Sequence, residues 1–299
     1  MKHSGIPRVP RPLFSDMLAR KIYLAFPMGR RKVFTLSYDD GNTCDIPLVE
    51  MMRKYGIKGT FHLNSGIEPF DGIPQEKRPW RPMTMAECVD LFGDDMEIAI
   101  HGAHHPFWDK MPPAQAMADI LQDRQNLENA TGKIIRGASY PYGAFNQDIV
   151  DILRLMDIQY CRTVKDSYTT RLPSDPDWLR LDPTCHHDDP QLMPLADSFL
   201  SAEDAHLHML YVWGHTHELV VKGNWDVMEK LFQKVGMRED IWYATGIEIV
   251  EYLNAAKKLI YNLAQTLVRN PTDTDIWLNI APENHLIVVP AGKTVSLPG

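Results

Sequence analysis

The chain of 299 residues has few cysteines and no long hydrophobic run. Its four cysteines show no Cys-x-x-Cys spacing, so they indicate neither a zinc ribbon nor a disulfide framework. No apolar run approaches the roughly 18 residues of a membrane-spanning helix. The N-terminus also lacks the apolar core of a signal peptide. We therefore expect a cytoplasmic protein with reduced cysteines and no membrane among its partners.

Basic residues are scarce relative to acidic ones. The chain has 31 Lys and Arg against 39 Asp and Glu, which gives a formal net charge of -8. Its basic blocks do not exceed the short Arg30-Arg31-Lys32. This balance argues against a nucleic-acid partner. What the chain does contain is typical of a globular protein, because 44% hydrophobic and 9% aromatic residues suffice to bury a sizeable core.

The order of the apolar segments predicts three parts. Residues 1–32 are rich in Pro and Arg and are expected to form an extended arm. Within 33–264, short β-branched or apolar runs alternate with longer amphipathic stretches, which indicates repeated βα units around a parallel sheet. Residues 265–299 turn to short β-like pieces with Pro and Gly between them, which is typical of a small β appendage packed on the larger part.

The pattern of the central part favours an α/β barrel. The expected strands are 33–38, 60–63, 96–100, 134–140, 159–164, 179–181, 209–214 and 241–244. The expected helices are 46–55, 84–91, 113–130, 146–156, 190–205, 225–235 and 247–264, and the expected strands of the appendage are 275–280, 286–289 and 294–297. Seven or eight βα units favour a closed barrel. No Gly-rich nucleotide fingerprint follows the first strand, which disfavours an open doubly wound sheet.

Unusual polar residues follow four of the expected strands. Asp39 and Asp40 follow the first strand, residues 101–105 the third, 139–143 the fourth and 215–218 the seventh. In a barrel the C-terminal ends of the strands converge on one face, and that face carries the chemistry. The sequence therefore predicts that carboxylates and imidazoles meet in one pocket.

Two of these segments together predict a metal site. An Asp-Asp-Gly is often only a turn, but adjacent carboxylates point in different directions, so one of Asp39 and Asp40 can bind a metal while the other takes a proton from water. His101 and His105 are four residues apart, which lets both imidazoles face one point in a helical turn. Two imidazoles and a carboxylate suit zinc and leave coordination positions open for catalysis. The alternative is a solvated surface turn, and iron, cobalt, nickel or manganese also suit these ligands.

Other histidines and aromatic residues are open to two interpretations. His215 and His217 alternate on a strand-like segment and so share a face, although His217 can equally be a satisfied residue at a strand terminus. His187 follows the sixth strand and could reach the pocket, so a second metal site stays open but disfavoured. Aromatic residues that either stack on sugar rings or belong to the core are Tyr142, Trp108, Trp178 and Trp213.

The motif order resembles that of the NodB-homology polysaccharide deacetylases, or carbohydrate esterase family four, over residues 33–264. That family carries Thr-Phe-Asp-Asp-Gly, here Ser37-Tyr38-Asp39-Asp40-Gly41, and His-Ser/Thr-x-x-His-Pro, here His101-Gly102-Ala103-His104-His105-Pro106. It carries Arg-x-Pro-Tyr-Gly, here Ser139-Tyr140-Pro141-Tyr142-Gly143, and a late strand that ends in a His, here His215.

This resemblance implies a fold and a set of roles. The fold is a distorted (β/α)7-type barrel with the small C-terminal β appendage. One divalent ion, with zinc favoured, would be held by Asp40, His101 and His105. The catalytic residues implied are Asp39 as general base, His215 as general acid, and Tyr142, whose backbone amide would stabilise the oxyanion. We further expect substrate contacts from Tyr140, Trp213 and His187.

The chain also departs from the family pattern. Ser139 stands where the family has an Arg that pairs with the base, so either Arg136 or Arg162 replaces that cation or Asp39 is more basic. Gly102 replaces a hydroxyl residue of the His loop. Two candidates for the family's acidic-plus-Trp motif, neither a clear match, are Asp177-Trp178 and Asp182. These changes indicate a divergent branch.

The predicted function is metal-dependent removal of N-acetyl groups from amino sugars of a polysaccharide or oligosaccharide. An amide is a poor electrophile, so a metal would polarise it, a carboxylate would accept the proton of water, and an imidazole would protonate the amine. One alternative is a hydrolase of a small linear or cyclic amide or ureide, and another is an inactive glycan-binding barrel. Homo-oligomerisation stays open, because a neighbour's loop often completes such pockets.

Overall fold

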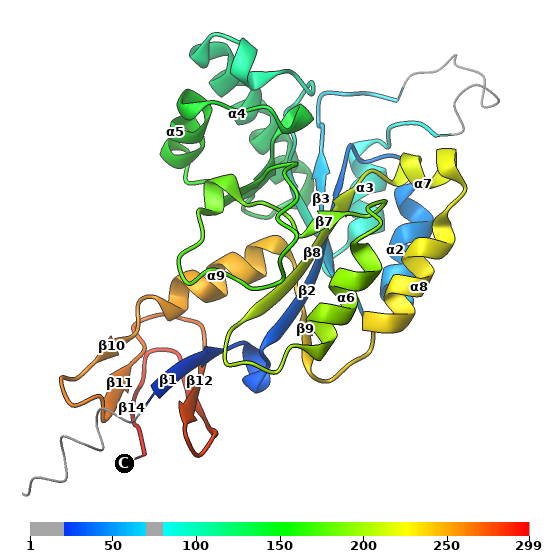
Figure 1. Cartoon of the computed structure of the whole chain (residues 1–299). Coiled ribbons are helices and arrows are strands. Elements are labelled where there is room, and N and C mark those ends of the chain that lie inside the picture. The colour runs from blue at the N-terminus through cyan, green and yellow to red at the C-terminus, as the bar shows by residue number, and fades with distance from the viewer. Residues whose placement is uncertain (1–20, 70–79, 299) are drawn as a thin grey trace, which may run out of the picture. The chain divides into compact units, whose positions relative to one another are not determined.

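A computed structural model describes residues 21–69 and 80–298 (Figure 1). The chain divides into a large compact unit, Arg31–Glu251, and a small one that combines Met1–Arg30 with Tyr252–Gly299. Residues 1–20 of the predicted arm lie outside the described residues, and the predicted boundaries at 32 and 264 stay predictions. Within the described ranges, no helix is both long enough and apolar enough to cross a membrane. The cytoplasmic location stays a prediction.

The large unit is built on a parallel sheet. The strand order is β6-β5-β4-β3-β2-β8-β7, and β9 pairs with β2 outside this path. The strands are β2 (Lys32–Asp39), β3 (Gly59–Leu63), β4 (Glu97–Ile100), β5 (Gly137–Ser139), β6 (Tyr160–Arg162), β7 (Cys185–His186), β8 (His208–Gly214) and β9 (Ile241–Tyr243). All of their pairings are parallel, so their C-terminal ends lie at the same edge. This curled path of seven strands is the distorted (β/α)7 barrel that the sequence predicts.

Helices connect and cover the strands. They are α2 (Asp45–Lys54), α3 (Met85–Phe92), α4 (Pro113–Thr131), α5 (Gln147–Leu155), α6 (Leu192–Ser201), α7 (Thr216–Lys222), α8 (Trp225–Val235) and α9 (Gly246–Ala256). Local sequence fixes several starts: Thr84 and Glu87 form a reciprocal capping box at α3, and Asn146 caps α5. Helix α6 packs on both α8 and β8, on the side of the sheet that also carries α2 in Figure 1.

Strand β2 runs through the middle of the sheet and is buried along its whole length. Its apolar residues Phe34, Leu36 and Tyr38 belong to the hydrophobic core cluster. The alternate residues Thr35, Ser37 and Asp39 are buried but polar. Because side chains of a strand alternate between faces, the polar set shares one face, which ends at Asp39.

One expected strand is wrong. Residues 179–181 form no strand, because Trp178–Arg180 is a 3-10 turn and Leu181 makes only an isolated bridge to Arg162. Prolines at 173, 176 and 183 surround this segment and cannot donate to a ladder. The strand that pairs with β8 instead is the two-residue β7.

Two expectations at segment ends are also wrong. The helix expected over 247–264 ends at Ala256, and Ile260–Tyr261 form β10, which pairs antiparallel with β11 (Leu267–Arg269). His217 does not continue a strand with His215, because β8 ends at Gly214 and α7 begins at Thr216. The helical turn at this point changes which side chains can approach His215.

The described residues of the small unit form two three-stranded antiparallel sheets, β1-β12-β13 and β10-β11-β14. Its remaining strands are β1 (Lys21–Ala25), β12 (Ile276–Ala281), β13 (His285–Val289) and β14 (Thr294–Ser296). The described end of the predicted arm is thus a strand, which pairs with β12 from Lys21↔Ala281 to Ala25↔Trp277. Each expected appendage strand begins or ends within one residue of an observed strand.

Core packing predicts the effect of a large-to-small substitution. The rings of Phe61 and Phe92 stack with centroids 4.1 Å apart, and both side chains are almost fully buried. Phe61→Ala is expected to lower the free energy of unfolding by about 3–5 kcal/mol, because it leaves a cavity beneath Phe92. Leu155→Ala is the control, since Leu155 is 77% exposed and should cost below about 0.5 kcal/mol. Equal urea midpoints for the two variants would contradict this packing.

Candidate active site

The parallel strands bring the predicted polar residues together at one edge of the sheet. Strand β2 supplies Asp39, and the loop after β4 begins with His101. Strand β5 ends at Ser139, and His215 directly follows β8. Strand β6 adds Arg162, whose register partner across the β5–β6 ladder is Ser139. The predicted convergence is therefore present in the structure.

Asp40, His101 and His105 form a group that could hold a metal ion. His101 Nε2 lies 3.1 Å from His105 Nε2, and Asp40 Oδ1 lies 3.8 and 3.7 Å from these two nitrogens. One point in the plane of these three atoms lies about 2.1 Å from each of them. This distance is the length of a zinc bond to nitrogen or carboxylate oxygen. The three ligand atoms are thus close enough for one divalent ion to contact all of them.

Ser139 fixes the tautomer of His101. The Ser139 hydroxyl donates to Asp39 Oδ1 at 3.2 Å and lies 2.7 Å from His101 Nδ1. Because the single hydroxyl proton goes to the carboxylate, Nδ1 carries the imidazole proton and donates to Ser139. The lone pair of His101 is then on Nε2, which faces Asp40 and His105. Burial also lowers the pKa of His101, which keeps the ring neutral as a ligand must be.

Helix α4 holds the loop that carries His101 and His105. Asp123 Oδ2 accepts from the His101 N–H at 3.0 Å, and Asp119 Oδ2 accepts from Trp108 Nε1 at 3.0 Å. Gly102 has φ +79°, and a Cβ there would come within 3.0 Å of Asp119 Oδ2. This explains why glycine replaces the hydroxyl residue expected from the family. The roles of Asp119 and Asp123 were not predicted, although their four-residue spacing on a buried helix face is a signal.

Three residues of the site have left-handed backbones that side chains other than glycine rarely adopt. These are Asp40 with φ 80°, His105 with φ 51° and Tyr142 with φ 58°. Such conformations are costly and concentrate at functional sites, where the surrounding structure imposes them. They aim the Asp40 and His105 side chains at one point, which an ordinary turn would not do.

Arg162 supplies the cation that Ser139 does not. Its Nη2 donates to Asp39 Oδ2 in a short contact, and its Nε donates to Ser37 Oγ at 2.8 Å. Its guanidinium lies 4.6 Å from the centroid of the Trp213 ring. The other candidate, Arg136, instead pairs with Asp157 at 2.9 Å. The arginine that pairs with Asp39 is thus on β6, directly across the β5–β6 ladder from Ser139.

Asp39 is a buried carboxylate in a positive environment. Burial alone raises the pKa of Asp39, but Arg162 and then His101 outweigh it and hold that pKa well below its usual range. The carboxylate is therefore ionised at neutral pH. Its Oδ2 lies 3.7 Å from His101 Nε2, on the side of the three candidate ligands.

His215 also lies close to Asp39. His215 Nε2 lies 3.9 Å from Asp39 Oδ2, and its Nδ1 lies 3.3 Å from Glu218 Oε1. Burial lowers the pKa of His215, but the Glu218 carboxylate and the charges of Asp39 and Asp40 raise it to about 9. His215 is therefore protonated at neutral pH. The sequence did not predict the part played by Glu218, because it depends on the helical turn after β8.

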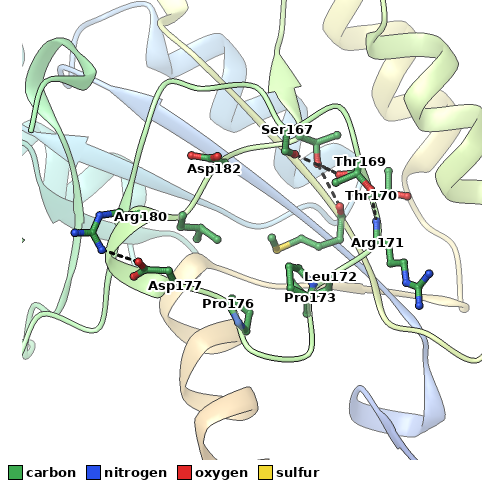
Figure 2. Close-up of a pocket in the computed structure, with 13 residues that line it drawn as sticks. Ser167, Thr169, Thr170, Arg171, Leu172, Pro173, Pro176, Asp177, Arg180 and Asp182 are labelled. Atoms are coloured by element: carbon green, nitrogen blue, oxygen red, sulfur yellow. Dashed lines mark hydrogen bonds and ion pairs between the residues drawn. The ribbon is translucent and has the colours of Figure 1, made fainter.

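A cavity of about 210 Å³ lies away from these residues, beneath the loop that follows β6 (Figure 2). Its lining includes Asp177 and Asp182, the two candidates for the acidic motif. Asp177 pairs with Arg180 at 2.7 Å, and Asp182 accepts from Thr163 Oγ1 at 2.5 Å. The two carboxylates therefore bind neighbouring groups of their own loop.

The pocket that opens on the candidate metal ligands is larger, about 360 Å³. It is lined by Asp40, Asn42, Asn64, Ile67, Trp80, Pro82, His104, His105, Tyr142 and His217. The half-exposed rings of Tyr142 and Phe107 stack with centroids 3.8 Å apart, and Trp80 stacks on His217 at 5.2 Å. Aromatic faces of this kind suit a sugar ring.

The structure does not bring the three expected substrate residues into this pocket. Tyr140 is 1% exposed, and its hydroxyl donates to the Leu179 carbonyl. Trp213 donates from Nε1 to Asp166 Oδ1 at 2.9 Å. His187 is fully buried next to Tyr38. In this geometry all three are supporting residues, and their contact with a substrate stays a prediction without support.

Comparison with known proteins confirms the predicted resemblance. The polysaccharide deacetylase family model matches residues 28–161, a segment that includes both Asp39-Asp40 and His101–His105. No curated protein matches the sequence. The chain is thus similar to the polysaccharide deacetylases over less than half of its length, and its identity to the solved structures is low.

Solved structures support the fold. A candidate polysaccharide deacetylase from Mycobacterium smegmatis aligns with a TM-score of 0.53 and 14% identity, over 79% of this chain and 94% of its own. A Streptococcus pyogenes deacetylase aligns with a TM-score of 0.42 and 16% identity. The alignment covers 49% of this chain and 61% of the streptococcal chain. A Bacillus anthracis pseudoenzyme of carbohydrate esterase family four has a TM-score of 0.47 and 14% identity, over 76% of this chain and 68% of its own. The first alignment confirms the barrel fold.

The buried pair of Arg162 and Asp39 predicts a strong effect on stability. Arg162→Gln is expected to lower the free energy of unfolding by about 3–5 kcal/mol, because it leaves the Asp39 charge buried without its partner. Adding Asp39→Asn should recover part of that loss, which a double-mutant cycle in urea measures. Arg136→Gln is the control, because its partly exposed ion pair is worth at most about 1 kcal/mol. Additive effects of the two site substitutions would contradict the pairing.

Proposed function

We propose that the chain is a metal-dependent hydrolase that removes N-acetyl groups from amino sugars of a polysaccharide or oligosaccharide. The observation that carries the proposal is the position of Asp39. Its Oδ2 lies 3.7 Å from Nε2 of His101, one of the three candidate metal ligands, and 3.9 Å from Nε2 of His215. A base, an acid and an ion-binding group thus surround one point, as the hydrolysis of an amide requires.

Asp40, His101 and His105 would hold the ion, and zinc suits two neutral imidazoles and one carboxylate. A bound divalent ion polarises the acyl carbonyl and lowers the pKa of water. Asp39 accepts the proton of the attacking water, since Arg162 keeps this carboxylate ionised. Asp39 is placed to do so without itself being one of the three ligands.

His215 completes the reaction as the general acid. It carries a proton at neutral pH, because Glu218 and the two aspartates raise its pKa. Donation of this proton from Nε2 to the leaving nitrogen lets the amine depart as a neutral group. Tyr142 lies beside the ligands, with its ring centroid 4.3 Å from that of His105. As the family resemblance implies, its backbone amide would stabilise the oxyanion.

The aromatic pocket supports a sugar as the substrate. The exposed ring of Tyr142 and the stacked pair of Trp80 and His217 lie in the cavity that opens on Asp40 and His105. Flat apolar rings next to polar groups bind the apolar face of a pyranose while the polar groups orient its hydroxyls.

Acetate release tests the function and the role of Asp39. The wild-type protein is expected to release acetate from N-acetylglucosamine oligomers. Asp39→Asn should lower kcat on the order of 100- to 10,000-fold, because the amide cannot take the proton. The variant should still bind metal, and Asp94→Asn is the control, since Asp94 is almost fully exposed. A fully active Asp39→Asn protein would refute the mechanism. Turnover of small cyclic amides or ureides but not of the oligomers would refute the substrate.

The state of His215 predicts the alkaline limb of the pH profile. The general acid must be protonated, so kcat should fall at alkaline pH, where His215 loses its proton. Glu218→Gln removes the carboxylate 3.3 Å from His215 Nδ1 and should therefore move this limb to lower pH. Glu203→Gln, on a different loop, serves as the control. An alkaline limb that stays in place in Glu218→Gln would contradict the role of His215.

A further inference from the structure

A second group of side chains that could bind a metal lies next to His215, since Glu218 Oε1 is 3.3 Å from His215 Nδ1. It consists of His186, His187, Asp188 and Glu218, whose ligand atoms all lie within 4.8 Å of one another. The first three belong to the end of β7 and the turn after it, and Glu218 belongs to the first turn of α7. The group shares no residue with the site formed by Asp40, His101 and His105.

His187 has a buried ring nitrogen without a hydrogen-bond partner. Its side chain is fully buried, and its Nδ1 lies 3.2 Å from the Tyr38 hydroxyl. The other ring nitrogen, Nε2, has no hydrogen-bond partner, although two carboxylate oxygens lie close to it. These are Asp188 Oδ2 at 3.3 Å and Glu218 Oε2 at 3.4 Å. A buried polar atom without a partner indicates a bound ion or water.

Both carboxylates are fixed with one oxygen turned toward His187. The Asp188 N–H donates to His186 Nδ1 at 3.2 Å, so the proton of His186 is on Nε2, which donates to Glu218 Oε2 at 2.9 Å. Asn224 Nδ2 donates to Asp188 Oδ1 at 2.7 Å, and Lys222 Nζ contacts Oδ2, the oxygen that lies toward His187. His186 and Asn224 therefore orient the two carboxylates.

We propose that His187, Asp188 and Glu218 bind a second divalent cation, with His186 holding Glu218 in place. Ligand atoms of a tetrahedral zinc site are about 3.3 Å apart, because the bonds are about 2.0–2.1 Å long. The distances of 3.3 and 3.4 Å from His187 Nε2 agree with this value. One imidazole and two carboxylates are ligands of zinc, cobalt or manganese.

The local backbone is shaped to admit His187. A Cβ on Gly214 would lie 2.0 Å from His187 Nδ1, so any larger residue at the end of β8 would displace the ring. The ring also stacks on Tyr38, with centroids 5.7 Å apart. These contacts hold Nε2 toward the carboxylates.

The Lys222 ammonium group would compete with the ion for Asp188. Its Nζ makes a short contact with Asp188 Oδ2, the same oxygen that would bind the cation. The Lys222 side chain is 54% exposed and can move into water when an ion binds. Occupancy of the site by the ion is therefore expected to displace the Lys222 ammonium group.

The second ion would act on the general acid through Glu218. Glu218 Oε2 faces the second ion, while its Oε1 lies 3.3 Å from His215 Nδ1. An ion at this position would fix the carboxylate that orients His215. This consequence rests on the proposed function, whereas binding of the ion does not.

The number of zinc ions bound per chain tests the proposal. In equilibrium dialysis of the full chain against zinc, the wild type should bind two ions. His105→Ala and Asp188→Asn should each bind one, and the double variant none. The matched control is Asp189→Asn, because Asp189 binds Tyr168 and the Gln191 N–H outside the group, so this variant should bind two. Thermal unfolding checks that each variant is folded.

One zinc ion in the wild type, lost in His105→Ala and kept in Asp188→Asn, would overturn the second site. Lys222→Gln removes the competitor and should tighten binding of the Asp188-dependent ion several-fold, and weaker binding would overturn the assignment of Asp188 as a ligand. A protein that binds two ions but releases no acetate would refute the proposed function and leave the second site intact.

Discussion

The ion pair between Asp39 and Arg162 is the interaction on which the site depends. Both side chains are almost completely buried at the end of the barrel, where neither charge can be solvated. A buried charge is tolerated only with a partner and with hydrogen bonds to its remaining atoms. Ser37 and the Thr163 carbonyl accept from the guanidinium, and Ser139 donates to the carboxylate. The pair is thus part of a buried network of hydrogen bonds inside the barrel.

This network also orders the candidate metal ligands. The hydrogen bonds run from Asp39 through Ser139 to His101, so the charge on Asp39 determines which nitrogen of His101 carries the proton and which carries the lone pair. On the other side, Asp39 and Glu218 together keep His215 protonated. One buried carboxylate therefore couples the ion-binding group to the acid, and the left-handed backbones of Asp40 and His105 complete the alignment.

The sequence predicts the strands and the main polar residues of this site better than the contacts that support them. The alternation of apolar runs and the polar residues at their ends were sufficient to predict the barrel, the order of the motifs, and the convergence of Asp39, His101 and His215. The position of Arg162 opposite Ser139 depends on the register of two strands, which the spacing of residues does not reveal. Only the structure distinguishes Arg162 from Arg136.

Other features could not be predicted from the local sequence, because they also depend on tertiary structure. The segment 179–181 looks like a strand because it is apolar, but the surrounding prolines and the short β7 decide the pairing. The approach of Glu218 to His215 requires the helical turn of α7, whereas a strand was expected there. The buried face of α4, with Asp119 and Asp123, acts on the His loop only through the tertiary packing.

The central claim is that Asp40, His101 and His105 hold a divalent ion beside Asp39. The most direct test is an anomalous difference map from a crystal grown with zinc and measured on both sides of the zinc absorption edge. The account predicts a zinc peak bonded to Asp40 Oδ1, His101 Nε2 and His105 Nε2, with the Asp39–Arg162 pair intact. Well-ordered side chains at these positions without a zinc peak between them would contradict it.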